Sequence, residues 1–484
     1  MSKLSIYNSL TQQKNPFEVE NNLIKWYMCG ITPYAASHLG HARTYIMFDV
    51  IRRLLRDYFN YSVTLVMNIT DIDDKIINKA NDEGKDFREV AKYWENEFLN
   101  DMKALNVEPP TVLTRVSDYI PQIINYIKHL IEKDVAYPSH GSVYFNSENF
   151  AKTHTSKLTP HHHDTQDEET FSNEKRSPKD FVLWKAAKPN EPFWDSPWGK
   201  GRCGWHIECS VMAHEVLGDH LNLHSGGEDL KFPHHANEIA QSEAYAGTDN
   251  WVDYFIHSGH LHIDGAKMSK SLKNFITIKA VLQRYDANTL RLLFLLHKYN
   301  SVIDYSEDGM NYAQSINTTL TNFVQNMQSS RFSLYSNTTW TSSDAEFNDR
   351  YLQIQSKIDA TLRDNFDTPQ FISLLLKLIN ETNKYIGGQG PQLNLLIDVS
   401  QYIFKMLNLV GLKYSETYSS HSDLTSNILD LLLKYRNEVR VAAKAKNIGK
   451  LFELSDAIRD VHLPQLGFKV SDDQKTGQSY WSKM

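Results

Sequence analysis

Four residues of types that bind zinc stand in three separate segments of the chain: Cys29, Cys209, His234 and Glu238. His234 and Glu238 are four positions apart, so on a helix they project from one face and can share an ion. Thiolate, imidazole and carboxylate are all good zinc ligands. Because a soft thiolate binds zinc far better than a hydroxyl does, such an ion could distinguish a substrate thiol from a hydroxyl.

The same residues also have simpler explanations. Cys29 and Cys209 are two of only three cysteines, and a lone buried cysteine usually packs as a small hydrophobic side chain. A histidine and a glutamate four positions apart often form only a contact on a helix surface. Spacing alone leaves both interpretations open, so the rest of the chain must decide between them.

Two further strings of residues suit phosphate. His38-Leu39-Gly40-His41 falls where a loop enters a predicted helix, and a helix N terminus offers N–H groups and partial positive charge to an anion. Gly40 would let a ligand approach the backbone closely. Lys267-Met268-Ser269-Lys270-Ser271 follows a predicted strand and turn. Its lysines could stabilise the charge on departing pyrophosphate, although a solvated surface loop is the alternative interpretation.

The composition is that of an ordinary globular protein with room for two to four domains, since the chain has 484 residues. Its formal net charge of −7 argues against a protein that coats nucleic acid by bulk attraction. Three cysteines suit a reducing compartment. No signal peptide is evident, and the longest apolar run, at 290–296, is interrupted by Arg291. We therefore expect a cytoplasmic protein.

The order of the predicted elements favours an α/β fold with a parallel sheet. Strand-like and helical segments alternate along the first part of the chain, at 23–28, 41–59, 61–69 and 74–105. The pattern resumes further on, with segments at 205–216, 221–224 and 234–246. Ligands in such folds lie beyond the carboxyl ends of the strands, which is where Cys29 would be.

An insertion at about 107–185 separates these two parts. It contains a predicted helix at 119–133, a strand at 142–145 and a polar stretch at 151–178. The polar stretch includes His161, His162 and His163, which we interpret as part of a flexible loop because no cysteines accompany them.

The last part of the chain is predicted to be helical. Apolar residues recur at helical spacing in three segments, 289–297, 313–327 and 371–386. Polar stretches at 329–349 and 414–426 are predicted linkers. Six basic residues then follow with only Glu438 opposing them: Lys434, Arg436, Arg440, Lys444, Lys446 and Lys450. They form either a solvated helix face or a contact with nucleic acid.

The histidine and lysine strings together resemble the HIGH and KMSKS signatures of class I aminoacyl-tRNA synthetases. Four other segments are similar to cysteinyl-tRNA synthetase, namely NITDIDDKI (68–76), DFVLWK (180–185), SPWGKGRCGWHIECS (196–210) and DLKFPHHANEIAQSEA (229–244). The resemblance covers nearly the whole chain, since LPQLGFKVSDD (463–473) is similar to the end of that family's anticodon-binding domain. The segment HLHIDGAKMSKSLKNFITI (260–278) leans toward the eukaryotic cytosolic type.

The resemblance implies particular roles for residues of this chain. One zinc ion per chain would be bound by Cys29, Cys209, His234 and Glu238. The ATP phosphates would meet His38, His41, Lys267 and Lys270, with Gly40 and Lys270 binding the nucleotide. The cysteine substrate would lie against Gly30, Thr70, Trp205, His206, His224, Asp229 and His234.

The resemblance also implies a domain order. A Rossmann-like catalytic domain would comprise 1–106 and 186–256, interrupted by a connective domain at 107–185. Three further parts would follow: a stem-contact region with the lysine string (257–312), a helical bundle (313–413) and a small anticodon-binding domain (427–484).

The implied activity is ligation of L-cysteine to tRNA(Cys) through a cysteinyl-adenylate, with ATP and Mg²⁺. The substrate carboxylate is ionised at neutral pH, so the first step needs no general base. Zinc–thiolate binding would exclude serine without an editing domain. We expect no membrane partner and a monomer or homodimer. Candidate anticodon contacts are Arg440, Lys444, Lys446 and Trp481.

Two alternatives remain beside this interpretation. A similar ligase joins cysteine to an amino sugar in mycothiol synthesis, but such proteins lack the anticodon-binding end that this chain retains. A non-catalytic RNA-binding paralogue could keep a structural zinc site. It would not need both histidines of 38–41 and both lysines of 267–271.

Overall fold

The computed structural model describes residues 3–158, 174–189, 191–263, 265–267, 275–328, 339–388, 391–414, 423–472 and 479–483. It divides into two compact units, one of residues 1–414 and one of residues 415–484, and each is described by itself. Among the described helices, none combines the length and apolar character needed to cross a membrane.

The centre of the first unit is a five-stranded parallel sheet in the order β11-β10-β3-β4-β5. Its strands are β3 (Leu23–Ile31), β4 (Ser62–Ile69), β5 (Val112–Arg115), β10 (Leu221–Gly227) and β11 (Val252–Ser258). The chain proceeds outward from β3 in one direction and resumes at β10 on its other side, so the strand order reverses between these two neighbours. The predicted parallel sheet is confirmed.

Helices cover this sheet, and local side chains set where they begin and end. These helices are α1 (Leu39–Arg53), α3 (Phe87–Ala104), α6 (Ile207–Leu217) and α7 (Ala236–Ala246), and a further helix, α2 (Asp74–Glu83), packs against α3. The Asp73 carboxylate caps α2 by accepting from the Lys75 N–H at 2.8 Å, and Gly84 ends that helix with a φ of 64°. A wider turn, η2 (Leu54–Tyr58), continues α1.

The predicted helix at 234–246 begins too early. The α-helix starts at Ala236, and His234 lies in the preceding turn η5 (Lys231–His235), where Phe232 has extended backbone angles. Pro233 has no N–H and fixes its own φ, so a regular helix does not extend back through this segment.

An antiparallel sheet forms from the predicted insertion and the chain just after it, where the sequence indicated one strand. The sheet has the order β6-β7-β8-β9, with β6 (Ala136–Ser139), β7 (Ser142–Phe145), β8 (Phe181–Ala186) and β9 (Gly201–Cys203). Helix α4 (Ile120–Glu132) and the short α5 (Ser147–Phe150) accompany it. The histidine run 161–163 lies outside the described residues.

Three short strands lie between the parallel sheet and the helical part. They have the order β13-β12-β14, with β12 (Leu261–Ile263), β13 (Ala266–Lys267) and β14 (Ile303–Tyr305). Helices α8 (Ile278–Leu282) and α9 (Ala287–Leu295) separate β13 from β14 in the chain. A hairpin of β1 (Ser5–Asn8) and β2 (Gln13–Pro16) precedes β3.

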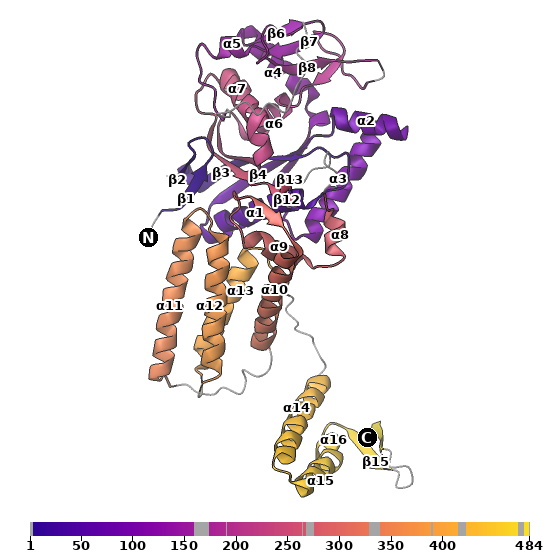
Figure 1. Ribbon diagram of the computed structural model, residues 1–484, viewed down its shortest axis with the longest axis vertical. Helices are drawn as coiled ribbons and strands as arrows, with labels where there is room; N and C mark the ends of the chain where they lie inside the picture. Colours follow the sequence, from indigo (N-terminus) through magenta and orange to yellow (C-terminus); the bar gives the residue numbers. More distant parts are fainter. Residues whose placement is uncertain are drawn as a thin grey trace. The chain divides into compact units, whose positions relative to one another are not determined.

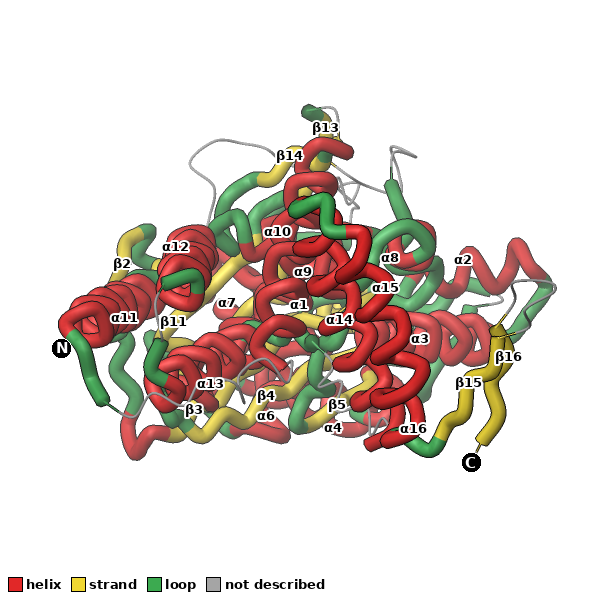
Figure 2. The backbone as a smooth tube through the Cα atoms, turned by 90° about the horizontal axis from the view of Figure 1, so that it is seen from below, coloured by secondary structure: helices red, strands yellow, loops and turns green. Residues whose placement is uncertain are grey.

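Four long helices form the end of this unit that is remote from the antiparallel sheet (Figure 1). They are α10 (Glu307–Gln328), α11 (Ser342–Arg363), α12 (Thr368–Ile386) and α13 (Leu393–Leu409). Figure 2 shows α11, α12 and α13 nearly end-on. The predicted linker at 329–349 is wrong from Ser342 onward, because Thr341 and Asp344 form a reciprocal cap that starts α11.

The second unit contains α14 (Asp423–Lys444), α15 (Ile448–Ala457), the turn η7 (Ile458–His462), α16 (Leu463–Gln465) and the hairpin β15 (Phe468–Asp472) and β16 (Ser479–Lys483). Helix α14 begins inside the predicted linker 414–426. All six basic residues from Lys434 to Lys450 are exposed.

Arg291 joins four elements of the first unit through one fully buried side chain. Its guanidinium donates to the Asp49 carboxylate of α1 and to the carbonyl oxygens of Leu105, Asn106 and Val410. Gly411 has a φ of 72°, and a Cβ there would lie 2.2 Å from the guanidinium. The ends of α3 and α13 are thus fixed to α1 and α9 by one cation.

Replacing Arg291 with Met should destabilise this unit. The change removes the Arg291 donors from the Asp49 carboxylate, which keeps its bond from Arg53 at 2.9 Å, and from the buried carbonyl groups of Leu105 and Val410. Breaking this buried pair should lower the free energy of unfolding by about 3–5 kcal/mol. The measurement is the midpoint of urea unfolding. As a control, Lys298→Met removes an exposed pair with Asp367 at 3.4 Å and should cost no more than about 1 kcal/mol. Equal midpoints for the two variants would contradict the role of Arg291.

Candidate active site

Gly30 interrupts strand β3 next to Cys29 and sets where that cysteine lies. The pairing of β3 with β4 shifts register between Met28 and Ile31. A Cβ on Gly30 would lie 1.6 Å from the carbonyl oxygen of Asn68, and the Gly30 N–H donates to the Asn68 side chain at 2.8 Å. Asn68 also donates to the Thr70 hydroxyl at 3.0 Å. Gly30 and Thr70 therefore lie together at the carboxyl ends of neighbouring strands.

The four proposed metal ligands come together behind this strand end. The ligand atoms of Cys29, Cys209, His234 and Glu238 all lie within 4.8 Å of one another, and all four side chains are buried. The two sulfur atoms are 4.0 Å apart, and the Cys29 Sγ is 3.6 Å from Glu238 Oε1. His234 Nε2 is 2.9 Å from the same carboxylate oxygen. The two residues meet although His234 precedes the helix.

The electrostatics of this cluster favour ionised ligands. Burial disfavours the charged form of Glu238, but His224 and His234 outweigh it and lower the pKa of Glu238 to about 2. Burial likewise opposes ionisation of Cys209, yet the hydrogen bond from Cys29 and the charge of His234 lower its pKa to about 6. Burial and the neighbouring Cys209 raise the pKa of Cys29. One of the two thiols is thus ready to bind a cation at neutral pH.

A second set of donors overlaps the first. Cys29, His224, His235 and Glu238 also lie within 4.8 Å of one another. His224 Nε2 is 2.9 Å from Glu238 Oε2, and His235 Nε2 is 3.4 Å from the Cys29 Sγ. Both sets share Cys29 and Glu238. They differ in whether a second sulfur or a second imidazole completes the site.

His235 and His257 were not anticipated from the sequence. His235 Nδ1 is 2.8 Å from His257 Nε2, and His257 Nδ1 is 2.8 Å from the Ser9 hydroxyl. All three side chains are buried, and the two hydrogen bonds connect them. Of the two strands involved, only part of β10, at 221–224, is predicted from the sequence, and β11 is not predicted. Their register, which pairs Gly226 with His257, comes from the sheet itself.

Two other predicted substrate contacts, Trp205 and His206, adjoin His234. The Trp205 ring stacks on the His234 ring with centroids 4.9 Å apart, and Trp205 is 37% exposed. His206 Nδ1 is 2.9 Å from His234 Nδ1. Asp229 lies in the turn η4 (Glu228–Leu230) that follows β10. A partly exposed aromatic face therefore adjoins the buried ligand atoms.

The two histidines of the His38–His41 string are fixed to the first turn of α1. The Gly40 N–H donates to His38 Nδ1 at 3.1 Å, and the His38 N–H donates to His41 Nδ1 at 3.2 Å. Because each Nδ1 accepts, each neutral ring carries its proton on Nε2. The rings stack with centroids 3.9 Å apart. A Cβ on Gly40 would lie 2.9 Å from the His38 ring, so a larger residue there would require that ring to shift.

The lysine string is described only in part. Lys267 is the last residue of β13, where its backbone pairs with His262 of β12. Lys270 lies outside the described residues, as do its neighbours from Met268 to Asn274. The segment after the string returns to α1, since the Leu39 N–H donates to the Ile276 carbonyl at 3.0 Å.

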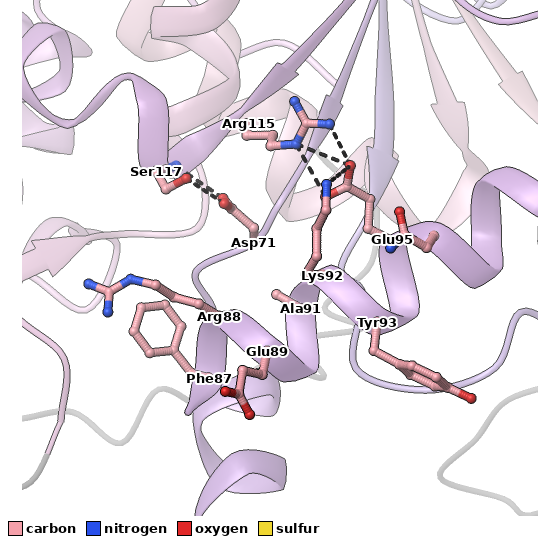
Figure 3. A pocket seen from close by; sticks show the side chains of 11 residues that line it. Asp71, Phe87, Arg88, Glu89, Ala91, Lys92, Tyr93, Glu95, Arg115 and Ser117 are labelled. Carbon is pink, nitrogen blue, oxygen red and sulfur yellow. Dashed lines mark hydrogen bonds and ion pairs between the residues drawn. The ribbon is translucent and has the colours of Figure 1, made fainter. Parts of the chain in front are cut away.

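A separate pocket of about 660 Å³ lies beyond the carboxyl ends of β4 and β5, against the first turns of α3 (Figure 3). Several of its charged groups form hydrogen bonds with other residues of the pocket lining. Arg115 donates to both carboxylate oxygens of Glu95, and Asp71 accepts from the backbone and hydroxyl of Ser117. None of the predicted site residues lines this pocket. This pocket is therefore separate from the cluster at the end of β3.

Comparison with known proteins agrees with this arrangement. Residues 16–315 match the family described as tRNA synthetases class I (C) catalytic domain. The cytoplasmic cysteine–tRNA ligase of Dictyostelium discoideum is 43% identical over 511 residues, covering 98% of this chain and 77% of that protein. The cysteine–tRNA ligase of Encephalitozoon cuniculi is 42% identical over 474 residues, covering 98% of each chain.

A solved structure supports the fold independently. The methionyl-tRNA synthetase of Mycobacterium tuberculosis superposes with a TM-score of 0.62 at 16% identity, covering 84% of this chain and 94% of that one. This similarity confirms the predicted Rossmann-like architecture. The resemblance found in the sequence is likewise confirmed, and the chain belongs to the cysteine–tRNA ligase family of class I aminoacyl-tRNA synthetases.

Proposed function

We propose that this protein activates L-cysteine with ATP and transfers it to the 3′ end of tRNA(Cys). The observation that carries the proposal is the position of the buried donor cluster at the carboxyl end of β3. The chain that leaves this cluster leads directly to His38 and the N terminus of α1. An anchor for a thiol and a site for phosphate thus lie at the two ends of one short loop.

We propose Cys29, Cys209, His234 and Glu238 as the ligands of one zinc ion. This set offers two sulfur ligands, and Cys209 has the lowered thiol pKa that metal binding requires. The alternative set would replace that second sulfur with His235 Nε2, which is 3.4 Å from the Cys29 Sγ. When bound, the zinc would hold the substrate thiolate and so favour cysteine over serine. Gly30, Thr70, Trp205, His206, His224 and Asp229 would line the rest of the amino-acid pocket.

The phosphates of ATP, which would bring Mg²⁺, are assigned to the start of α1. His38 and His41 would donate from Nε2, and the absence of a side chain at Gly40 would let the nucleotide approach the backbone. Lys267 and Lys270 would meet the charge that develops on the leaving pyrophosphate. Positioning and charge stabilisation are then the protein's main tasks.

The reaction needs no base in its first step. The cysteine carboxylate attacks the α-phosphorus, the bond to the β-phosphate oxygen breaks, and cysteinyl-adenylate and pyrophosphate result. A terminal ribose hydroxyl of the tRNA then attacks the carbonyl carbon, and AMP leaves with the electron pair of the broken C–O bond. The hydroxyl proton is released in this second step.

The remaining parts are assigned by the family resemblance. We propose the catalytic domain at 1–106 and 186–256, the connective domain at 107–185, the stem-contact region at 257–312 and the bundle at 313–413. The anticodon would be read by 427–484, with Arg440, Lys444, Lys446 and Trp481 as contacts. We also propose a cytoplasmic location, in line with the names of similar proteins, and a monomer or homodimer.

Ligand variants should separate the two overlapping metal sets. Cys209→Ser removes a ligand found only in the first set and should lower the zinc retained after dialysis at least tenfold, together with the affinity for cysteine. His235→Ala removes a ligand found only in the second set and should keep its zinc. The measurement is zinc per chain by elemental analysis. Full zinc in Cys209→Ser with loss in His235→Ala would assign the second set instead.

The activity is tested by transfer of labelled cysteine, with serine as control, to a tRNA bearing the GCA anticodon. We expect cysteine to be transferred and serine to remain near background, since a hydroxyl is a poor zinc ligand. Cysteine-dependent ATP–pyrophosphate exchange without transfer to tRNA would point to another acceptor, such as an amino sugar. Absence of both reactions would favour a non-catalytic RNA-binding protein.

The basic helix α14 should affect only the tRNA step. Arg440→Ala removes an exposed cation, so tRNA charging should weaken and its salt dependence should become shallower by about one phosphate contact. Pyrophosphate exchange should keep its wild-type rate. Equal loss in both assays would indicate that Arg440 stabilises the fold instead.

A further inference from the structure

Arg43 lies on α1 two residues after His41, and its side chain is 1% exposed. Its guanidinium donates to three backbone carbonyl groups, those of His260, Tyr299 and Ser301. The described residues include no carboxylate that pairs with it, and its Nε atom has no hydrogen-bond partner among them. Arg43 is thus a buried cation held almost entirely by backbone dipoles.

The three carbonyl groups belong to the base of the small sheet that carries Lys267. His260 immediately precedes β12, and Ser301 lies two residues before β14. These strands pair in parallel, and β12 also pairs with β13, where His262 is opposite Lys267. The backbones touch at this base, because a Cβ on Gly259 would lie 2.1 Å from the Ser301 carbonyl oxygen. Arg43 therefore fixes both chain segments from which the sheet begins.

Other contacts of the same helix start reach the chain on both sides of the lysine string. Before the string, the Thr44 hydroxyl is 2.7 Å from the Ser258 hydroxyl. After it, the Ile278 N–H donates to the Ser37 carbonyl at 3.1 Å. Segment 37–44 thus binds the backbone that leads into the string and the backbone that leaves it. Arg43 is the buried centre of this junction.

Packing alone does not account for an arginine at this position. Taking a guanidinium out of water without a carboxylate is costly, and an apolar side chain of similar volume would fill the space without that cost. Burial lowers the pKa of Arg43 to about 9, so the side chain is still charged at neutral pH. Unlike an apolar side chain, arginine supplies a rigid planar set of donors, and these donors hold three carbonyl groups in one fixed arrangement.

We propose that Arg43 is a positioning residue for the ATP-dependent step. It sets the distance between the N terminus of α1, with His38 and His41, and strand β13, which ends at Lys267. The proposal rests on the proposed function, since both groups are assigned there to the phosphates of ATP. It predicts that a change at Arg43 disturbs the use of ATP more than the binding of cysteine, whose pocket lies at the end of β3.

The test compares Arg43→Met and Arg43→Lys with Arg291→Met in cysteine-dependent ATP–pyrophosphate exchange. Arg291→Met is the matched control, because Arg291 is equally buried and also binds carbonyl groups, but at the junction with α13. All variants are assayed well below their melting temperatures. We expect Arg43→Met to lower kcat/KM for ATP by about 10- to 100-fold, with KM for cysteine and zinc content within twofold of wild type.

Arg43→Lys should recover part of the loss, since an ammonium group keeps the charge and three donors but not their planar geometry. Arg291→Met should keep its KM for ATP while melting at a lower temperature. Parallel losses for ATP and cysteine, or equal kinetic behaviour of Arg43→Met and Arg291→Met, would overturn the positioning role and leave a structural one. If wild-type protein shows no cysteine-dependent exchange, the proposed function fails and not this inference alone.

Discussion

The active site depends on one constraint, which is that the carboxyl ends of parallel strands meet at a single edge of the sheet. Strand order reverses between β3 and β10, so the loops that follow these neighbours diverge and leave space between them. Cys29 lies near the end of one strand of this pair, and the turn and helix that follow the other carry His234 and Glu238 toward it. Residues about two hundred positions apart in the chain thus become neighbours because both segments end at the same edge of the sheet.

This constraint explains why much of the site could be predicted from residue types. The α/β order and the family resemblance gave the parallel sheet, and the thiols, imidazole and carboxylate of the cluster stand where a strand or helix begins or ends. The structure brings Cys29, Cys209, His234 and Glu238 together, while their roles stay predictions. The domain boundaries also stay predictions, and Lys270 lies outside the described residues.

The features that could not be predicted from the sequence depend on the register between strands and on hydrogen bonds to backbone groups. His257 faces His235 only because β11 pairs with β10 in one particular register. The antiparallel sheet of the insertion was missed because its strands are only three to six residues long. Arg291 did leave a signal, since it interrupts an apolar run. Its partners are mostly carbonyl groups, however, and every residue has one, so no pattern of side chains could indicate them.

The Arg291 junction also limits the order in which the protein can fold during synthesis. Asp49 and the carbonyl groups of Leu105 and Asn106 leave the ribosome before Arg291, but Val410 and Gly411 follow it by more than a hundred residues. At about 5–20 residues per second, on the order of ten seconds separate the cation from its last acceptor. During that interval the sheet can form while α9 still lacks its contact with the end of α13. The buried contacts of Arg291 are therefore complete only after the end of α13 has been synthesised.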